Sequence, residues 1–188
     1  MVEALIFDCD GTLTDSMPLH FLAWREVMQR VNIEFTEERF YELAGMPGDE
    51  VLSAIAGDSL SEAEKHRLLQ ERESLFFDSL EKVQPISEVV NIAREHKDHF
   101  PMAVASGSIR ESVDRQLTSI GILDWFQVTV TAEDTELHKP EPDVFLEAAR
   151  RLGVKPQACR VYEDSDFGIE AARRAGMEFV DVRPLYRK

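Results

Sequence analysis

Cysteine is scarce in this sequence, with Cys9 and Cys159 as the two examples among 188 residues. Each lies beside a predicted strand, and neither has a thiol or imidazole partner at the spacing of a metal site. Unpaired cysteines in such positions behave as small hydrophobic side chains. We therefore expect two buried thiols and no metal site built on cysteine.

Positive charge and long apolar runs are also in short supply. The 21 lysines and arginines stand against 36 aspartates and glutamates, and the net charge of −15 argues against nucleic acid or an anionic membrane as a partner. No apolar run reaches membrane-spanning length, and only a few apolar residues precede Asp8, so neither a membrane span nor a signal peptide is predicted. We expect a cytoplasmic monomer whose anionic ligands are attracted by local cations.

The rest of the composition is typical of a globular protein, with 44% hydrophobic and 30% charged residues. A chain of 188 residues is long enough to bury a substantial core and to form one domain with an insertion. Acidic residues are spread along the whole chain, so no charged tail is predicted. The function must therefore be sought in local motifs.

The first such motif lies in residues 4–16, where an apolar run of strand-like length ends at Asp8 and Asp10. Side chains at i and i+2 of an extended chain point the same way, so both carboxylates are expected just past the end of a buried strand. Gly11 then allows a sharp turn. Two carboxylates this close need a nearby cation to stay ionised. The pattern suits a hard divalent metal together with acid–base or nucleophilic chemistry.

The motif has two other possible interpretations. Asp-x-Asp-Gly is also common turn chemistry, so the motif alone does not establish a site. A calcium loop of the EF-hand type, counted from Asp8, needs glycine at its sixth position and glutamate at its twelfth. Leu13 and Leu19 stand there instead. The EF-hand interpretation is therefore excluded.

Residues 16–82 show helical periodicity without an intervening strand. Apolar residues recur at helical spacing from Leu19 to Val31, Thr36 begins a second helix and Pro47 a third. Ser61 and Glu64 form a capping box for a long fourth helix that is predicted to end near Lys82. Four such helices predict a cap inserted after the first strand, and a helical insertion at the mouth of a site is a candidate lid.

From Gln84 onward, predicted helices and strands alternate. Strands are expected at 102–105, 128–131, 160–162 and 179–182, with helices at 86–96, 109–120, 142–152 and 166–175. Strands joined by helical crossovers form a parallel sheet covered on both faces. The sequence therefore predicts an α/β fold: a five-stranded, mostly parallel Rossmann-like sheet in residues 1–15 and 83–188, with a four-helix cap in residues 16–82.

Ligands of an open parallel sheet bind outside the carboxyl ends of its strands. Taken singly, each polar group at the predicted strand ends has an ordinary explanation as a helix cap or a surface charge. Together they supply a metal site beside an anion site, with a carboxylate nucleophile between them, which is suited to phosphoryl transfer. In chain order these groups are Asp8 and Asp10, then Ser106, Gly107 and Ser108, then Lys139, then Glu163 and Asp164.

In order and spacing, these residues resemble the four motifs of the haloacid dehalogenase-like hydrolase superfamily. The resemblance spans the whole chain and includes the helical cap. Within the superfamily, residues 101–108 and 163–169 are most similar to sugar-phosphate phosphatases of the fructose-1-phosphate type, and slightly less to β-phosphoglucomutase. The resemblance implies a Mg²⁺-dependent phosphatase acting on small phosphorylated metabolites, with sugar phosphates as the expected class.

The resemblance also implies roles for the acids. Asp8 would be the nucleophile that becomes an aspartyl-phosphate. Asp10 would protonate the leaving oxygen and later deprotonate the hydrolytic water. Mg²⁺ would be held by the Asp8 carboxylate, the Asp10 backbone carbonyl and Asp164, with Glu163 either binding the ion or supporting its ligands. A haloacid dehalogenase itself needs neither the second acid nor a metal, so Asp10 argues against that chemistry.

The phosphate would be bound by residues from the second and third motifs. The resemblance implies that Ser106 and the Gly107 N–H bind its oxygens, and that Lys139 neutralises charge on Asp8 and on the phosphate. A phosphate monoester cannot approach two carboxylates unless a metal and a lysine offset the repulsion. Substrate choice is expected to lie in the cap, with His20, the loop of residues 46–49 and Arg72 as candidates.

A phosphosugar mutase of the β-phosphoglucomutase type is the main alternative. A mutase holds a bisphosphorylated intermediate, so its cap needs a cation for the distal phosphate. In that family the cation is an arginine in the loop that aligns with residues 45–49, and Gly48 stands at the matching position here. His20 matches a hinge histidine of the same family, which keeps the mutase open.

A response-regulator receiver is a non-enzymatic alternative, because it is a small acidic parallel domain that is phosphorylated on aspartate. Its phosphorylated aspartate follows the third strand, where this chain has Glu133 and Asp134 ahead of Lys139. Receivers also lack a helical insertion after the first strand. This alternative ranks below both enzymes.

Overall fold

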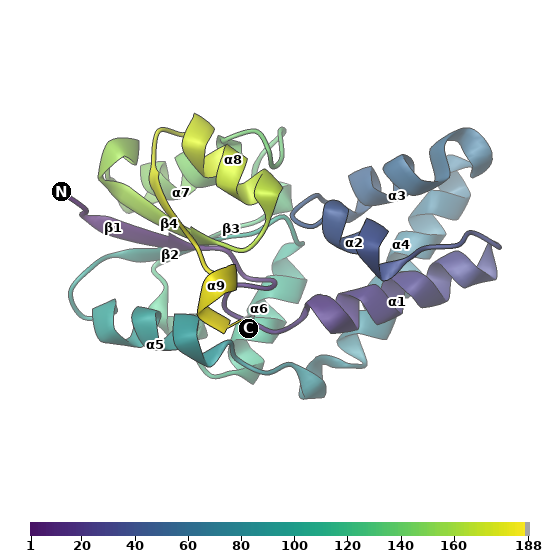
Figure 1. Cartoon of the computed structure of the whole chain (residues 1–188), viewed down its shortest axis with the longest axis horizontal. Coiled ribbons are helices and arrows are strands. Elements are labelled where there is room, and N and C mark those ends of the chain that lie inside the picture. The colour runs from purple at the N-terminus through teal and green to yellow at the C-terminus, as the bar shows by residue number, and fades with distance from the viewer. Residues whose placement is uncertain (187–188) are drawn as a thin grey trace.

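The computed structural model describes residues 1–186, apart from the side chain of Asp58. Its centre is a five-stranded sheet with the strand order β3-β2-β1-β4-β5, in which every neighbouring pair is parallel (Figure 1). The predicted α/β fold with a five-stranded parallel sheet is confirmed. The strands are β1 (Ala4–Phe7), β2 (Met102–Ala105), β3 (Val128–Val130), β4 (Cys159–Glu163) and β5 (Glu178–Asp181).

The first strand is the middle of the sheet, because β2 and β4 pair with its two edges. Ile6 lies beside Ala103 on one side and Val161 on the other. All four residues of β1 are buried. A continuous apolar strand without alternation is typical of a parallel sheet covered on both faces. This position places the residues that follow Phe7 at the centre of one sheet edge.

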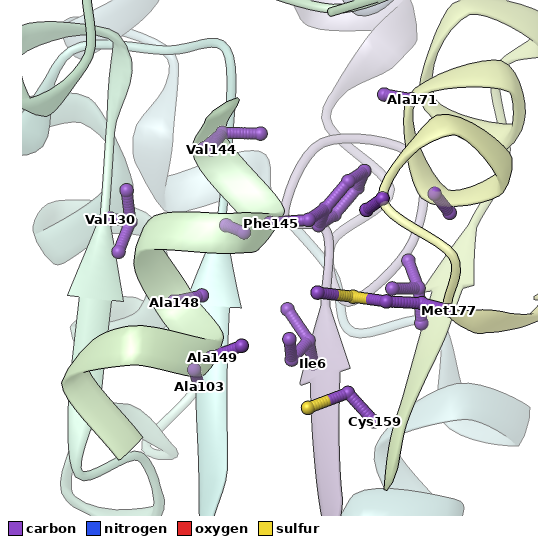
Figure 2. Close-up of a cluster of buried hydrophobic side chains, with 14 of the residues drawn as sticks. Ile6, Ala103, Val130, Val144, Phe145, Ala148, Ala149, Cys159, Ala171 and Met177 are labelled. Carbon is purple, nitrogen blue, oxygen red and sulfur yellow. The ribbon is translucent and has the colours of Figure 1, made fainter. Parts of the chain in front are cut away.

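One face of the sheet is covered by α7 (Asp143–Leu152) and α8 (Asp166–Arg174), as Figure 2 shows. Ile6 and Ala103 belong to this cluster together with Phe145 from α7. Alanines supply most of the helix contacts, and small side chains let the helices approach the strands closely. The alanines that α7 and α8 contribute to the cluster are Ala148, Ala149, Ala171 and Ala172.

The opposite face is covered by α5 (Ser87–His96) and α6 (Arg110–Ser119). Leu5 and Phe7 point to this side, in alternation with Ile6, because side chains of a strand alternate between its faces. The ring of Phe7 stacks on that of Tyr162 from β4 at 4.6 Å. The short α9 (Arg183–Tyr186), which the sequence analysis did not predict, places Tyr186 against this cluster.

Helices α1 (Met17–Arg30), α2 (Glu37–Glu42), α3 (Gly48–Ala56) and α4 (Glu62–Phe77) lie together on one side of the sheet (Figure 1). We call α1–α4 the cap bundle. It has an apolar cluster of its own, centred on the buried side chains of Trp24, Leu52 and Leu68. The three predicted helix starts are observed: the Thr36 hydroxyl accepts from the Arg39 N–H, Pro47 directly precedes α3, and Ser61 and Glu64 form a capping box.

The fourth helix is shorter than predicted, since it ends at Phe77 rather than near Lys82. The Ser79 hydroxyl donates to the Phe76 carbonyl at 2.7 Å, and this bond satisfies a carbonyl that a continuing helix would use. Short 3₁₀ turns occur at residues 57–59, 80–82, 123–125, 132–134 and 156–158.

The two chain segments that connect the cap bundle to the sheet lie side by side. The Asp15 N–H donates to the Gln84 carbonyl at 2.8 Å, and the Ile86 N–H donates to the Leu13 carbonyl at 3.0 Å. The chain therefore enters and leaves the cap bundle through adjacent segments, whereas the exact division at residues 15–16 and 82–83 stays a prediction. Across residues 1–186, helices that combine enough length and apolar character to cross a membrane are absent.

Candidate active site

The turn after β1 is built around Gly11. The Gly11 N–H donates to the Thr14 carbonyl at 2.8 Å, and the Cys9 carbonyl accepts from Leu13 and Thr14. Gly11 has a φ of 79°, and a Cβ at this position would lie 2.3 Å from Asp164 Oδ2. Any other residue would therefore push the turn away from Asp164. The glycine lets the first and fourth motifs meet.

A buried lysine links the third motif to the first and fourth. Lys139 is 1% exposed, and its Nζ donates to Asp8 Oδ1 at 2.7 Å and to Glu163 Oε2 at 2.8 Å. Its third contact is the Ala105 carbonyl at the end of β2, at 3.3 Å. Burial would lower the pKa of Lys139, but the two carboxylates outweigh burial and raise it. Lys139 is thus held as a buried cation.

The acids around this lysine carry more negative charge than it neutralises. Burial and the nearby Glu163 raise the pKa of Asp8 well above its ordinary value, by more than Lys139 lowers it. Ligand oxygens of Asp8, Glu163 and Asp164 all lie within 4.8 Å of one another. Buried carboxylates in excess of the available cation are the donor set that a divalent metal neutralises. The chemistry of these residues therefore fits Mg²⁺.

Glu163 differs from the other two acids because both of its oxygens already have partners. Oε2 accepts from Lys139, and Oε1 accepts from the N–H groups of Asp164 and Ser165 and from the Ser165 hydroxyl. A Cβ on Gly168 would lie 2.1 Å from the Glu163 Cδ, so the start of α8 packs directly on this carboxylate. These contacts favour a supporting role for Glu163, with Asp8 and Asp164 as the metal-binding carboxylates.

Asp10 is held by four donors, none of which touches Asp8. They are the Ser16 hydroxyl at 2.7 Å, His20 Nε2 at 2.7 Å, the Ser108 hydroxyl at 2.7 Å and Gln116 Nε2 at 2.8 Å. Burial alone would raise the pKa of Asp10, but its contacts with His20 and Ser16 outweigh burial and hold the pKa far below its ordinary value. Asp10 is ionised in this arrangement.

His20 and Arg72 form the cap side of the Asp10 contact. Arg72 Nη2 lies 3.3 Å from His20 Nδ1, and the imidazole stacks on Phe76 at 3.7 Å. Arginine has only donors, and an ionised carboxylate only accepts. His20 therefore donates from Nε2 to Asp10 and accepts from Arg72 at Nδ1. Both cap residues predicted from the sequence are brought to the site.

The phosphate-binding residues predicted from the second motif lie at the end of β2. Ser106 is buried, and its Oγ accepts from the Ser108 N–H at 3.0 Å. A Cβ on Gly107 would lie 2.6 Å from the Gly45 carbonyl oxygen, and one on Gly45 would lie 2.7 Å from Ser165 Oγ. We call residues 43–47, which connect α2 and α3, the cap loop. The cap loop thus rests directly on the ends of β2 and β4, and glycine is required on both sides of the contact.

A cavity of about 60 Å³ lies between the strand ends and the cap bundle. Small-molecule sites usually measure about 300–1,000 Å³. The cavity in this arrangement is therefore several times smaller than a sugar phosphate requires. Of the predicted site residues, it is lined by Asp8, Asp10, His20, Arg72, Ser106, Gly107, Glu163 and Asp164, while Lys139 reaches it through Asp8.

Sequence reasoning missed several contacts of this site. Gln116 lies on the same helix face as Val113 and Leu117, so a polar residue at a core position was the signal for its bond to Asp10. Phe76 resembles any apolar residue of α4, and its stacking on His20 has no signal in the sequence. The Tyr186 hydroxyl donates to the Gly11 carbonyl at 2.6 Å across almost the whole chain, and the sequence does not indicate this contact.

Comparison with known proteins agrees with this geometry. The sequence profile of the haloacid dehalogenase-like hydrolase family matches residues 5–182. Fructose-1-phosphate phosphatase YqaB of Escherichia coli (strain K12) is 38% identical over 182 residues, covering 96% of each chain. β-Phosphoglucomutase of Bacillus subtilis (strain 168) is 31% identical over 190 residues, covering 96% of this chain and 83% of that protein.

Solved structures lead to the same family. The crystal structure of β-phosphoglucomutase from Clostridium difficile superposes with a TM-score of 0.87 at 29% identity, over 95% of this chain and 83% of that one. The match covers both the sheet and the cap bundle. The predicted hydrolase superfamily is therefore confirmed, and the chain belongs to the haloacid dehalogenase-like hydrolases.

Proposed function

We propose that this protein is a Mg²⁺-dependent phosphatase that hydrolyses small phosphorylated metabolites, with sugar phosphates similar to fructose 1-phosphate as the substrate class. One observation carries the proposal: the Lys139–Asp8 ion pair lies beside buried acids and Ser106 at a single cavity. The names of the relatives support the same class, because YqaB is a fructose-1-phosphate phosphatase and a relative from Thermotoga maritima is a phosphorylated carbohydrates phosphatase.

In the proposed first step, an oxygen of the Asp8 carboxylate attacks phosphorus while Lys139 holds Oδ1. The bond between phosphorus and the sugar oxygen breaks, and that oxygen takes a proton from Asp10. Ser106 and the Gly107 N–H stabilise the negative charge on the phosphoryl oxygens. The products of this step are the free sugar and an aspartyl-phosphate on Asp8.

In the second step, water attacks the aspartyl-phosphate, Asp10 accepts a proton from that water, and inorganic phosphate leaves. The four donors around Asp10 favour its ionised form, which suits the base role. For Asp10 to act as an acid first, some of these donors must move away. Ser16 and His20 belong to the segment that begins the cap bundle, so motion of the bundle would change the protonation of Asp10.

Asp8 and Asp164 would hold the Mg²⁺ ion, with the Asp10 carbonyl as a further ligand and Glu163 in support. When bound, the ion would neutralise phosphate charge and polarise the phosphorus centre. The cap bundle would serve as a lid, because the cavity of about 60 Å³ is too small for a sugar phosphate to enter without motion. The paired crossings at Asp15 and Gln84 would act as its hinge.

The mutase remains the second candidate, since the fold of β-phosphoglucomutase is shared over nearly the whole chain. Among described residues that line the cavity, Arg72 is the lone cation, and its guanidinium pairs with Glu73. A distal phosphate would therefore find no unpaired cation there. A receiver would need Asp134 as its phosphorylated residue. Asp134 is instead paired with Arg110 and Arg151 and does not line the cavity, so the receiver hypothesis fails.

Asp8→Asn tests the proposal. We expect it to reduce hydrolysis of p-nitrophenyl phosphate by about a thousandfold or more while the thermal unfolding midpoint stays near that of the wild type. Asp15→Asn is the matched control, since Asp15 is an exposed acid in the same loop and should retain activity. Substantial residual activity of Asp8→Asn, or full wild-type activity in excess EDTA, would refute the mechanism.

A further inference from the structure

A second, open cleft of about 590 Å³ adjoins the catalytic cavity. It lies between the cap bundle, at α3 and α4, and the segment that follows β2. The two spaces lie side by side, because they share five lining residues: Met46, Gly48, Arg72, Gly107 and Ser108. Its volume falls within the usual range of about 300–1,000 Å³ for small-molecule sites.

The cleft is linked through Ser108 to Asp10, the group that would protonate the leaving oxygen. Ser108 lines both spaces, and its hydroxyl donates to Asp10 Oδ2 at 2.7 Å. The catalytic cavity has room for little more than a phosphoryl group, so the rest of a bound phosphate ester must extend elsewhere. The cleft is the adjoining space on the side of Asp10, where the leaving group departs.

The charges along the cleft are mainly negative. Asp49, Glu73 and Glu111 line it, against the cation Arg72 and the imidazole of His66. Arg72 is already paired with Glu73, and Glu111 bonds to Arg115, which lies outside the cleft. A cleft lined by one sign of charge focuses its field and disfavours ligands of the same sign.

The same cleft offers hydrogen-bonding groups that suit hydroxyls. Gln70 and Ser74 line it on α4. Within the described part of the chain, Arg72 Nε and Glu73 Oε2 are buried side-chain atoms without a hydrogen-bond partner. Arg72 is 8% exposed, so a donor left unpaired there is costly. A hydroxyl both donates and accepts, and so can satisfy either atom.

We propose that this cleft holds the non-phosphorylated part of the substrate and selects uncharged, hydroxyl-rich monophosphates over bisphosphates. The inference rests on the proposed phosphatase function and adds a selection rule, namely the preference for monophosphates over bisphosphates. Asp49 is the main determinant, because it is an exposed acid of the cleft that has no ion-pair partner among residues 1–186. A second phosphate on the leaving group would meet Asp49 and Glu111 without a free cation to offset them.

The test compares fructose 1-phosphate with fructose 1,6-bisphosphate by release of inorganic phosphate. The wild type should show a kcat/KM about tenfold higher for the monophosphate, and Asp49→Lys should raise the bisphosphate-to-monophosphate ratio about fivefold. The gain should shrink in 0.5 M NaCl, because salt screens exposed charges. Glu111→Lys, on the core side of the cleft, should shift the ratio in the same direction. It serves as the test variant if Asp49→Lys does not fold.

Glu38→Lys is the matched control, since it makes the same change in net charge at an exposed site of α2 outside the cleft. Its ratio should equal that of the wild type. A wild type that prefers the bisphosphate, or lysine variants that move the ratio no more than Glu38→Lys, would overturn the selection rule while leaving the phosphatase intact. Absence of phosphate release from both substrates and from p-nitrophenyl phosphate would overturn the phosphatase proposal as well.

Discussion

The two walls of the catalytic cavity differ in how completely their polar groups are satisfied. On the sheet wall, Lys139 Nζ donates to three oxygens and Asp10 accepts four hydrogen bonds, one of which comes from His20 of the cap bundle. On the cap side, Arg72 Nε at the cavity and Glu73 Oε2 at the adjoining cleft are buried and have no hydrogen-bond partner among the described residues. A fully bonded network is rigid, whereas open bonding positions invite a ligand. The comparison indicates chemistry on the sheet wall and recognition on the cap wall.

The largest effect is expected from removing Lys139, the cation of the sheet wall. Lys139→Met keeps much of the side-chain length but leaves Asp8 and Glu163 without their shared partner. Removing one member of a buried ion pair typically costs about 3–5 kcal/mol of folding free energy. We expect a lower midpoint in thermal unfolding and a loss of phosphatase activity of about a thousandfold. Lys155→Met, at an exposed site ahead of β4, is the control and should change neither quantity.

The contact between the two walls is the next target. Gly107→Ala places a methyl group where the Gly45 carbonyl lies, 2.6 Å away, so the cap loop cannot rest on the end of β2. We expect kcat/KM for a sugar phosphate to fall about a hundredfold, because a misplacement of about 1 Å has that effect on catalysis. The unfolding midpoint should change little. Unaltered kinetics would show that this contact is not needed in the reactive arrangement.

Two substitutions test whether His20 and Arg72 of the cap wall have different roles. His20 touches Asp10 directly, so His20→Ala should slow hydrolysis of p-nitrophenyl phosphate and of sugar phosphates alike. Arg72 touches Asp10 only through His20, so Arg72→Met should lower kcat/KM for sugar phosphates about tenfold more than for p-nitrophenyl phosphate. Equal losses for both substrates in Arg72→Met would place Arg72 with the chemistry instead of with recognition.

The smallest expected effect concerns Tyr186, whose hydroxyl holds the Gly11 carbonyl from outside the cavity. Tyr186→Phe removes one hydrogen bond, worth about 1 kcal/mol, and keeps the ring in its apolar contacts. We expect the Mg²⁺ concentration for half-maximal activity to shift by no more than about fivefold. The Mg²⁺-induced rise in unfolding midpoint should shift by no more than about 2 °C. A shift in neither quantity would mean that the turn is held well enough by Thr14 and Cys9.

The sequence permits prediction of most of the sheet wall and little of the cap wall, for a physical reason. Residues at strand ends are brought together by the rule that parallel strands end at one edge, so Asp8, Ser106, Lys139 and Asp164 could be grouped without coordinates. No comparable rule relates two helices of the cap bundle to the sheet. The stacking of His20 on Phe76 and the contact of Gly45 with Gly107 depend on how the bundle packs, which periodicity does not specify.

The position of β1 in the middle of the sheet also affects when the protein becomes active during synthesis. The ribosome produces β1 and its two acids first, yet this strand pairs with Met102–Val104 and with Cys159–Tyr162. The nascent chain therefore carries β1 without its two partner strands until β2 and β4 have been synthesised. No fragment that ends before Asp164 holds the assembled site, so a prematurely terminated product is inert toward phosphate esters rather than an unregulated hydrolase.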